Sequence, residues 1–254
     1  MMIETREERL AVVSDLHVGN PYSRAGHALG AFFDYAREQR LNLCINGDGF
    51  EILQASFAAL ASDSVDVLSR LKAHLDEGLR VYYVVGNHDI ALENFISSWS
   101  TMEITPFLNV TSGSLRIRIE HGHLYDPSFV RSPTMYEWMT RMAGPVLHLY
   151  PDVYRLWSMY EESKARVRRW YRRGPQHESI YCESADMLLR RGFDVVIFGH
   201  THQPLDVELA PGRRYVNSGN WMRGGSFVEI IDGQVELKHW TSTEGARVEP
   251  LVSG

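Results

Sequence analysis

The sequence predicts an α/β fold in which strands and helices alternate along the chain. Short runs rich in β-branched and aromatic residues recur, and amphipathic helical stretches separate the early runs. Several of these runs end in polar residues, as in open α/β sheets that bind ligands at the carboxyl ends of their strands. The chain has 254 residues, of which 44% are hydrophobic, enough for a sizeable core in one domain or in one domain with an insertion.

Six apolar runs are expected to form strands, each followed by the polar residues that close it. They cover residues 9–17, 41–48, 80–89, 114–123, 193–202 and 214–221. In one of them Leu115, Ile117 and Ile119 alternate with charged residues. This alternation predicts a strand that is buried on one face only.

The remaining elements are two helices and a hairpin. Amphipathic patterns predict helices at residues 28–40 and 65–77, and Gly78 is a typical helix stop. The runs 226–231 and 235–240 flank an Asp-Gly pair, which predicts a β-hairpin. The order strand, helix, strand, helix favours a sheet with crossover connections.

Residues 126–180, here called the insertion, interrupt this alternation of strands and helices. They are rich in Arg, Tyr, Trp and Met, with prolines spread through them. The insertion has nine Lys/Arg and six Asp/Glu, a balance of +3, whereas the rest of the chain has 17 basic and 26 acidic residues, a balance of −9. We therefore expect a single domain over residues 1–254, with the insertion as a helical cap between two core strands.

The composition excludes some classes of protein. The longest apolar runs have only a few residues, so no transmembrane helix is expected. The N-terminal stretch has no apolar signal-peptide core before its first strand. Cys44 and Cys182 fit a reduced cytoplasmic protein and lie in no metal-binding spacing. A disulfide between them is the alternative.

Polar residues of a few types gather where the predicted strands end. They are Asp15, His17, Asp48, Asn87, His88, Asp89, His121, His123, His200 and His202. Imidazole, carboxylate and carboxamide groups without thiolates suit Mn, Fe or Zn. They are too many for one ion, whereas two ions that share a bridging carboxylate would use them. Two divalent ions with Asp15 and Asp48 leave a charge of about +2, which favours a phosphate-like substrate.

Five short motifs, "DLH", "GDGFE", "GNHD", "HGH" and "GHTH", follow one another in this order between residues 15 and 202. The chain thereby resembles the calcineurin-like metallophosphoesterases. The resemblance implies a four-layer αββα sandwich and two divalent ions, with manganese favoured over iron or zinc. It assigns Asp15, His17 and His202 to the first ion and Asn87, His121 and His200 to the second, with Asp48 bridging both.

The same resemblance gives roles to four neighbours of these ligands. His88 would act on the phosphoryl oxygen or the leaving group, and Asp89, in the same motif, is a candidate catalytic residue or else a loop residue. Glu51 would orient a metal ligand or form a surface salt bridge. His123 would contact substrate or solvent, and Asn87 would face substrate besides binding metal. A metal-bridging hydroxide would attack phosphorus in line.

The motifs "GDGFE", "GHTHQP" and "RRYVNSGNW" with a helical cap resemble most the UDP-2,3-diacylglucosamine diphosphatases of lipid A synthesis, which implies hydrolysis of a pyrophosphate bond. Two positions depart from that enzyme type: His88 replaces an expected arginine, and His123 replaces the aspartate of an expected "HGD". The alternative is a phosphodiesterase or phosphatase acting on soluble nucleotides or phosphoproteins. A non-catalytic scaffold is a third hypothesis, against which the complete ligand set argues.

The insertion carries the expectations about substrate and membrane. Its aromatic and aliphatic residues could line acyl chains or form an ordinary cap core. The run of residues 164–173 has six positive charges and no acid, and Arg168 and Arg169 are expected to bind substrate phosphates. The same run could contact an anionic surface, peripheral to the inner membrane, where each cation contributes about 1 kcal/mol. A solvated helix face is the alternative, and nucleic acid is not expected as a partner.

Overall fold

The structure is a computed structural model, and it describes most of the chain outside the insertion. The described residues are 3–20, 23, 26–52, 57–90, 92, 102–131, 176–222, 224–241 and 247–250. The insertion is therefore described only at its two ends. The predicted helical cap between them, with the basic run 164–173 and with Arg168 and Arg169, lies outside the described residues.

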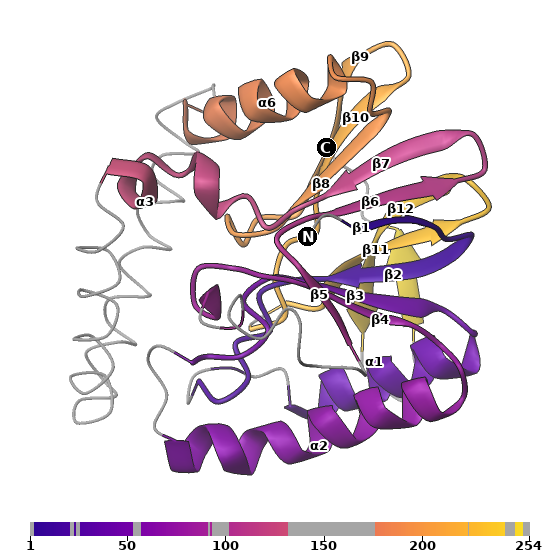
Figure 1. The fold of residues 1–254 in the computed structure, drawn as a ribbon, viewed down its shortest axis with the longest axis vertical. Helices are drawn as coiled ribbons and strands as arrows, with labels where there is room; N and C mark the ends of the chain where they lie inside the picture. The colour runs from indigo at the N-terminus through magenta and orange to yellow at the C-terminus, as the bar shows by residue number, and fades with distance from the viewer. Residues whose placement is uncertain are drawn as a thin grey trace.

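Two mixed β-sheets form the centre of the fold (Figure 1). In spatial order the seven-stranded sheet contains β13 (Arg247–Pro250), β12 (Gln234–Thr241), β11 (Ser226–Ile231), β2 (Arg9–Val13), β3 (Asn42–Asn46), β4 (Val81–Val84) and β5 (Glu103–Thr105). The six-stranded sheet contains β1 (Ile3–Arg6), β6 (Leu108–Ser112), β7 (Leu115–Ile119), β8 (Val195–Phe198), β10 (Arg213–Asn217) and β9 (Leu205–Ala210). Strands β2, β3 and β4 are parallel to one another, as are β7, β8 and β10. The carboxyl ends of these parallel strands therefore lie at the same end of each sheet.

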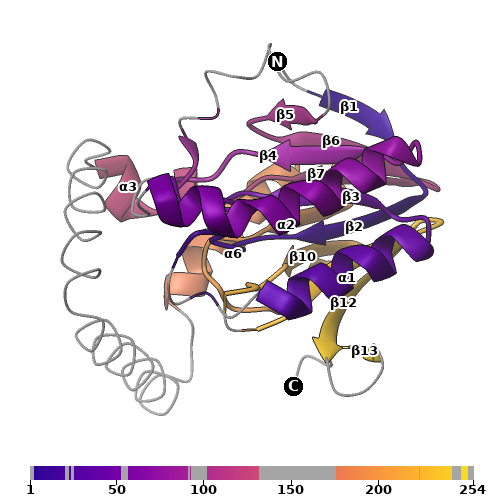
Figure 2. The same ribbon diagram turned by 90° about the horizontal axis from the view of Figure 1, so that it is seen from below.

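Helices cover the outer faces of both sheets. The helices α1 (Gly26–Glu38) and α2 (Phe57–Asp76) pack on the seven-stranded sheet, and α6 (Gln176–Leu189) packs on the six-stranded sheet (Figures 1 and 2). Two shorter elements lie where the insertion begins: the 3₁₀ turn η2 (His123–Tyr125) directly before it and α3 (Pro127–Arg131) within it. The predicted four-layer αββα sandwich is confirmed.

The central strands are buried on both faces, which explains their nearly continuous apolar sequence. In β2, Leu10 and Val12 point into the core between the sheets, whereas Ala11 and Val13 point into the core beneath α1 and α2. The second of these cores contains an aromatic cluster in which Phe32 lies 4.8 Å from Trp221, measured between ring centroids. The loops that follow these strands therefore begin from a packed framework.

Most predicted elements are present with shifted ends. All six apolar runs contain strands, both helices form, and β11 and β12 form the predicted hairpin. Gly78 follows the end of α2, as expected for a helix stop. The strands β1, β5, β6, β9 and β13 were not predicted, because they lie at or next to the sheet edges and lack the continuous apolar runs of the central strands.

The prediction that β7 is buried on one face only is wrong in part. Arg116 is exposed, but Arg118 is buried. The guanidinium of Arg118 lies 3.4 Å from the ring centroid of Phe107 and pairs with Glu120 at 3.3 Å. A cation–π contact and an ion pair allow a charged side chain to lie on a covered face.

Two further expectations concern cysteine and the membrane. Cys44 is buried and Cys182 is half-buried, and both are free thiols, so the alternative of a disulfide between them is excluded. Within the described residues, no helix combines the length and the apolarity needed to cross a lipid bilayer.

Candidate metal centre

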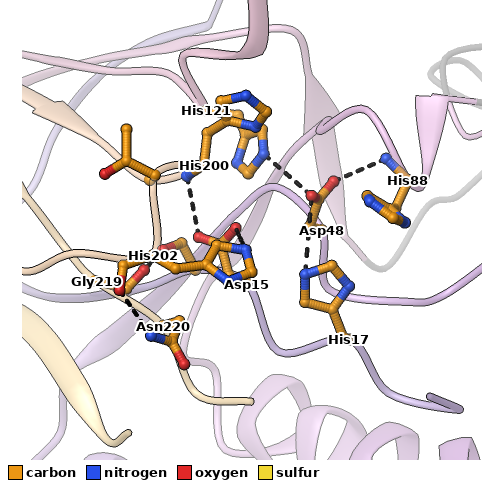
Figure 3. A network of polar contacts seen from close by, with 12 residues as sticks. Asp15, His17, Asp48, His88, His121, His200, His202, Gly219 and Asn220 are labelled. Atoms are coloured by element: carbon orange, nitrogen blue, oxygen red, sulfur yellow. Dashed lines mark hydrogen bonds and ion pairs between the residues drawn. The ribbon is translucent and has the colours of Figure 1, made fainter. Parts of the chain in front are cut away.

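Side chains from both sheets converge where their parallel strands end (Figure 3). The seven-stranded sheet contributes Asp15 and His17 after β2, Asp48 after β3, and Asn87 and His88 after β4. The six-stranded sheet contributes His121 after β7 and His200 and His202 after β8. Each sheet alone would place only part of this set, so packing of the two sheets completes the site.

The backbone at this site adopts an unusual conformation. Five of the residues, Asp15, His17, Asp48, His200 and His202, have positive φ angles of 54°, 47°, 52°, 63° and 58°. For residues other than glycine this costs on the order of 1–3 kcal/mol each and is concentrated at functional sites. The turns lock together through backbone hydrogen bonds, including Asp15 N to Gly47 O and His17 N to Asp48 O. These hydrogen bonds stabilise the turns, and the turns direct the side chains toward the centre of the site.

Three groups of side chains have the dimensions of cation sites, and one of them, His17, Asp48 and His88, shares members with the other two. Of those two, Asp15, His17 and His202 form the first, and Asp48, His121 and His200 form the second, with candidate ligand atoms within 4.8 Å of one another. Asp48 lies between the groups, because its Oδ2 is 3.3 Å from His121 Nε2 and 4.0 Å from His17 Nε2. This position suits the carboxylate that was predicted to bridge two ions.

The polar atoms at the centre fit a divalent cation. His17 Nε2 is buried and has no hydrogen-bond partner among the described residues, and the buried Asp15 Oδ1 and His121 Nε2 have only ion-pair contacts, with His202 at 3.0 Å and Asp48 at 3.3 Å. A buried polar atom without a partner costs about 1–3 kcal/mol. A bound cation would satisfy these atoms, and imidazole with carboxylate is a donor set for Mn, Fe or Zn.

The other ring nitrogen of three histidines is held by an acceptor. His17 Nδ1 lies 2.8 Å from Glu51 Oε2, and His121 Nδ1 lies 2.8 Å from the carbonyl oxygen of Asn46. His200 Nε2 lies 3.0 Å from Asp126 Oδ2. Because carboxylates and carbonyls only accept, each of these nitrogens carries a proton, and the opposite nitrogen is the one that would bind a metal.

Burial and charge shift the titration of the central groups in opposite directions. Burial would raise the pKa of Asp15, but nearby His202 and His121 outweigh it and lower the pKa to about 2. Burial would lower the pKa of His121, but Asp48 and Asp15 raise it to about 10. Without a metal, protonated imidazole supplies the positive charge that the carboxylates require. The centre is therefore built around positive charge.

Glu51 was expected either to orient a ligand or to form a surface salt bridge, and its burial excludes the surface alternative. Its Oε1 accepts from His88 Nδ1 at 2.6 Å, while its Oε2 accepts from His17 Nδ1 and, at 3.2 Å, from Asn20 Nδ2. Burial opposes ionisation, but the hydrogen bonds from both histidines lower the pKa of Glu51 to about 2. One ionised carboxylate thus orients a candidate ligand and the candidate substrate group.

Asp89 was predicted as a catalytic residue, and its carboxylate is engaged by the protein itself. It accepts hydrogen bonds from Gly49 N at 2.9 Å, from Gly86 N at 2.6 Å and from the hydroxyl of Tyr83. Burial and the charge of Asp48 raise the pKa of Asp89 to about 6. These contacts join the loops after β3 and β4 and favour a positioning role. Direct action on substrate stays a prediction.

His123, a predicted substrate contact, lies at the edge of the second group. Its ring is buried, packs edge-on against Phe129 at 4.9 Å and is 5.5 Å from the ring of His121. Burial, reinforced by the charge of His121, lowers the pKa of His123 to about 3. His123 is therefore a neutral imidazole beside the centre. Its contact with substrate stays a prediction, as does metal binding by the buried Asn87.

The glycines of two motifs are required by close approach. A Cβ atom on Gly86 would lie 2.2 Å from Asp48 Oδ1, and one on Gly47 would lie 2.3 Å from His121 Nδ1. Gly47 also has a φ of 78°, which favours glycine. The first glycines of "GDGFE" and "GNHD" therefore leave room for the side chains of His121 and Asp48, which pass directly over the backbone there.

Replacing Gly86 with alanine should displace the carboxylate of Asp48 and weaken metal binding about 10- to 100-fold, as when a group that orients a ligand is lost. Isothermal titration of the metal-free protein with Mn²⁺ measures this. Gly26→Ala is the matched control, because a Cβ there meets nothing within 4 Å. Unchanged Mn²⁺ affinity in Gly86→Ala would contradict the placement of Asp48 at the centre.

Two residues of the site were missed by sequence reasoning. Asp126 bonds to His200 from 74 positions away, and Asn20 bonds to Glu51 from 31 positions away. Asn20 follows the "DLH" motif closely, so its proximity to that turn could have been noticed. Asp126 has no such signal, because it begins the insertion and its partner follows the next core strand.

Comparison with known proteins connects this arrangement to a family. A family model described as calcineurin-like phosphoesterase matches residues 8–204. A UDP-2,3-diacylglucosamine hydrolase of Shewanella halifaxensis (strain HAW-EB4) is 24% identical over 234 residues, which cover 90% of this chain and 97% of that protein. Another of the same name, from Pseudomonas paraeruginosa (strain DSM 24068 / PA7), is 26% identical over 239 residues, covering 86% of this chain and 93% of that protein.

A solved structure supports the fold assignment. The Plasmodium protein GAP50, described as the anchor in the inner membrane complex, superposes with a TM-score of 0.51. It is 14% identical, and the match covers 96% of this chain and 89% of that chain. At this identity the likeness concerns the fold alone.

Proposed function

Because this chain belongs to the calcineurin-like phosphoesterase family, and is thus a phosphoester hydrolase, we propose that it splits the pyrophosphate bond of a UDP-diacylglucosamine-like lipid with the aid of two divalent cations. Water would add to one phosphorus and the bridging P–O bond would break, with UMP and a lipid phosphate as products. The observation that carries the proposal is the convergence of two candidate cation groups around Asp48.

The proposed ligands divide between the two groups. One ion would be held by Asp15, His17, Asp48 and His202, and the other by Asp48, Asn87, His121 and His200. When bound, the ions would activate water and neutralise charge on the phosphoryl oxygens. Manganese is the metal that we expect.

The residues beside the ligands would act on the substrate. His88 has its Nδ1 held by Glu51, which leaves Nε2 to donate a proton to a phosphoryl or leaving oxygen. His123 would border the space that the substrate occupies next to His121. Glu51 and Asp89 would act by positioning, because their carboxylate oxygens already accept hydrogen bonds within the protein.

A lipid-linked substrate is supported by the names of the relatives and by the start of the insertion. Leu124, which follows His123, is 57% exposed, and Val130 on α3 is 58% exposed. Apolar side chains at the entrance to the insertion would suit acyl chains. The basic run 164–173, with Arg168 and Arg169, would then contact phosphate groups of the substrate or of an anionic membrane surface.

A substrate comparison tests the proposal. The Mn²⁺-loaded protein should hydrolyse detergent-dispersed UDP-2,3-diacylglucosamine with a kcat/KM at least about tenfold higher than that for UDP-N-acetylglucosamine, since each buried CH₂ of an acyl chain contributes ~0.8 kcal/mol. Mass spectrometry should detect UMP and the lipid phosphate. In the same assay with anionic vesicles, Arg168→Ser/Arg169→Ser should slow lipid hydrolysis and spare a chromogenic phosphodiester.

The alternative is a phosphodiesterase or phosphatase for soluble nucleotides or phosphoproteins. It is favoured by His88, because the dedicated lipid enzymes are expected to have arginine there. A higher kcat/KM for soluble phosphoesters than for the acylated nucleotide-sugar would select this alternative. If the double arginine variant matched the parent on vesicles, the basic run would be a solvated surface.

A further inference from the structure

Asp126 contacts a candidate metal ligand from outside all five sequence motifs. Its Oδ2 lies 3.0 Å from Nε2 of His200, and both side chains are largely buried, with 19% and 10% of their surfaces exposed. The His200 backbone is fixed independently, because its N–H donates to Asp15 Oδ2 at 3.1 Å. The carboxylate of Asp126 therefore controls the orientation of the ring.

This contact determines which nitrogen of His200 faces the centre. A carboxylate accepts, so the proton lies on Nε2 and the lone pair lies on Nδ1. His200 belongs to the candidate cation group with Asp48 and His121. With Nε2 engaged by Asp126, Nδ1 is the atom that can complete this group.

The backbone around Asp126 is well anchored. Asp126 N donates to His123 O at 3.1 Å, and Asp126 O accepts from Val130 N at 2.9 Å. Next to it, the Tyr125 ring stacks on Phe198 at 5.3 Å, and the Tyr125 hydroxyl donates to Glu120 at 2.9 Å. Asp126, the first residue of the insertion, is thus anchored to the core of the six-stranded sheet.

The segment from residue 121 to residue 131 therefore touches the second group in three ways. It supplies His121 as a candidate ligand, it places His123 between that ligand and Phe129, and it holds His200 through Asp126. The first residue of the insertion is consequently part of the support of the metal centre.

We infer that Asp126 is a positioning residue that holds His200 for the second cation and so connects the insertion to the metal centre. The inference rests on the proposed two-cation function, because His200 must be a ligand for it to hold. A purely structural role is the competing explanation, since Asp before a helix is a favoured N-cap and Asp126 directly precedes α3.

Three variants separate these roles. Asp126→Asn keeps an acceptor of the same length and can still cap α3. Asp126→Ser keeps the capping ability but is too short to reach His200, and Asp126→Ala loses both functions. Asp186→Ser is the matched control, because it removes only an exposed ion pair with Arg190 on the outer helix α6.

The measurements are Mn²⁺ stoichiometry and affinity by isothermal titration, the electron paramagnetic resonance signal of a coupled Mn²⁺ pair, and the Tm of the metal-free protein. In Asp126→Ser we expect the second Mn²⁺ to bind about 10- to 100-fold more weakly, with loss of the coupled signal and a metal-free Tm lowered by only about 2–4 °C, as for one lost hydrogen bond. Asp126→Asn should restore binding to within about tenfold of the parent. Asp186→Ser should match the parent in all three.

The outcomes distinguish this inference from the proposed function. If the parent binds one Mn²⁺, or if His200→Ala retains two, the two-cation proposal fails. If the parent binds two and His200→Ala loses one, but Asp126→Ser binds both as the parent does, the inference about Asp126 is overturned. A lower metal-free Tm in Asp126→Ala alone, with normal Mn²⁺ binding in Asp126→Ser, would identify the role as helix capping.

Discussion

Replacing Asp48 with asparagine is expected to lower kcat/KM for a phosphodiester by about 10³-fold or more. Asp48 is the carboxylate that lies between the two candidate cation groups, 3.3 Å from His121 and 4.0 Å from His17. Cations at a reacting phosphoryl group contribute several kcal/mol, and each 1.36 kcal/mol corresponds to tenfold in rate. Asparagine retains the shape of the side chain and removes its charge.

The same variant should lose metal-dependent stability. A cation that binds only the folded state at 100 times its Kd adds about 2.7 kcal/mol to the free energy of unfolding. Addition of Mn²⁺ should therefore raise the Tm of the parent and should raise that of Asp48→Asn much less. Asp76→Ala, at an exposed ion pair with Lys72, is the control. Two bound ions in Asp48→Asn, measured by elemental analysis, would contradict a bridging role.

Replacing His88 with alanine is expected to lower kcat by about 10²–10⁴-fold, the range for loss of a general acid, and to leave metal content unchanged. The His88 backbone N–H donates to Asp48 Oδ1 at 2.8 Å, and alanine keeps that bond. The ring is oriented by Glu51 at 2.6 Å, and Glu51 keeps its contacts with His17 and Asn20 when the ring is removed. Burial opposes protonation of the ring, but Asp48 and Glu51 raise the pKa of His88 to about 9.

The leaving group supplies a control for this interpretation. An ester of p-nitrophenol leaves without protonation, so its hydrolysis should decrease less in His88→Ala than hydrolysis of an alkyl phosphodiester. Equal decreases for both esters would exclude proton donation to the leaving oxygen. Because His17, Asp48 and His88 also have the dimensions of a cation group, loss of one metal equivalent in His88→Ala would identify His88 as a ligand.

Much of the fold could be predicted from local sequence. The central strands β2, β3, β4 and β8 are buried on both faces, so their apolar runs are long enough to be detected, and the motifs mark their ends. The edge strands β1, β5 and β13 were missed because pairing with a neighbour, more than their own sequence, makes them strands. The buried Arg118 was misjudged for a related reason, since its partners Phe107 and Glu120 become visible only in the folded chain.

The candidate metal ligands, too, were predictable only in part from local sequence. The sequence alone determined their identity, because the ligand types and their order within the motifs are local properties. The tertiary structure decided which nitrogen of His17, His121 and His200 faces the centre, since Glu51, Asn46 O and Asp126 reach these rings from other strand ends. Hydrogen bonds between distant segments leave no periodic trace in a sequence. Pairing of strands within each sheet creates the contacts of Glu51 and Asp126, and packing of the two sheets creates the contact of Asn46 O with His121.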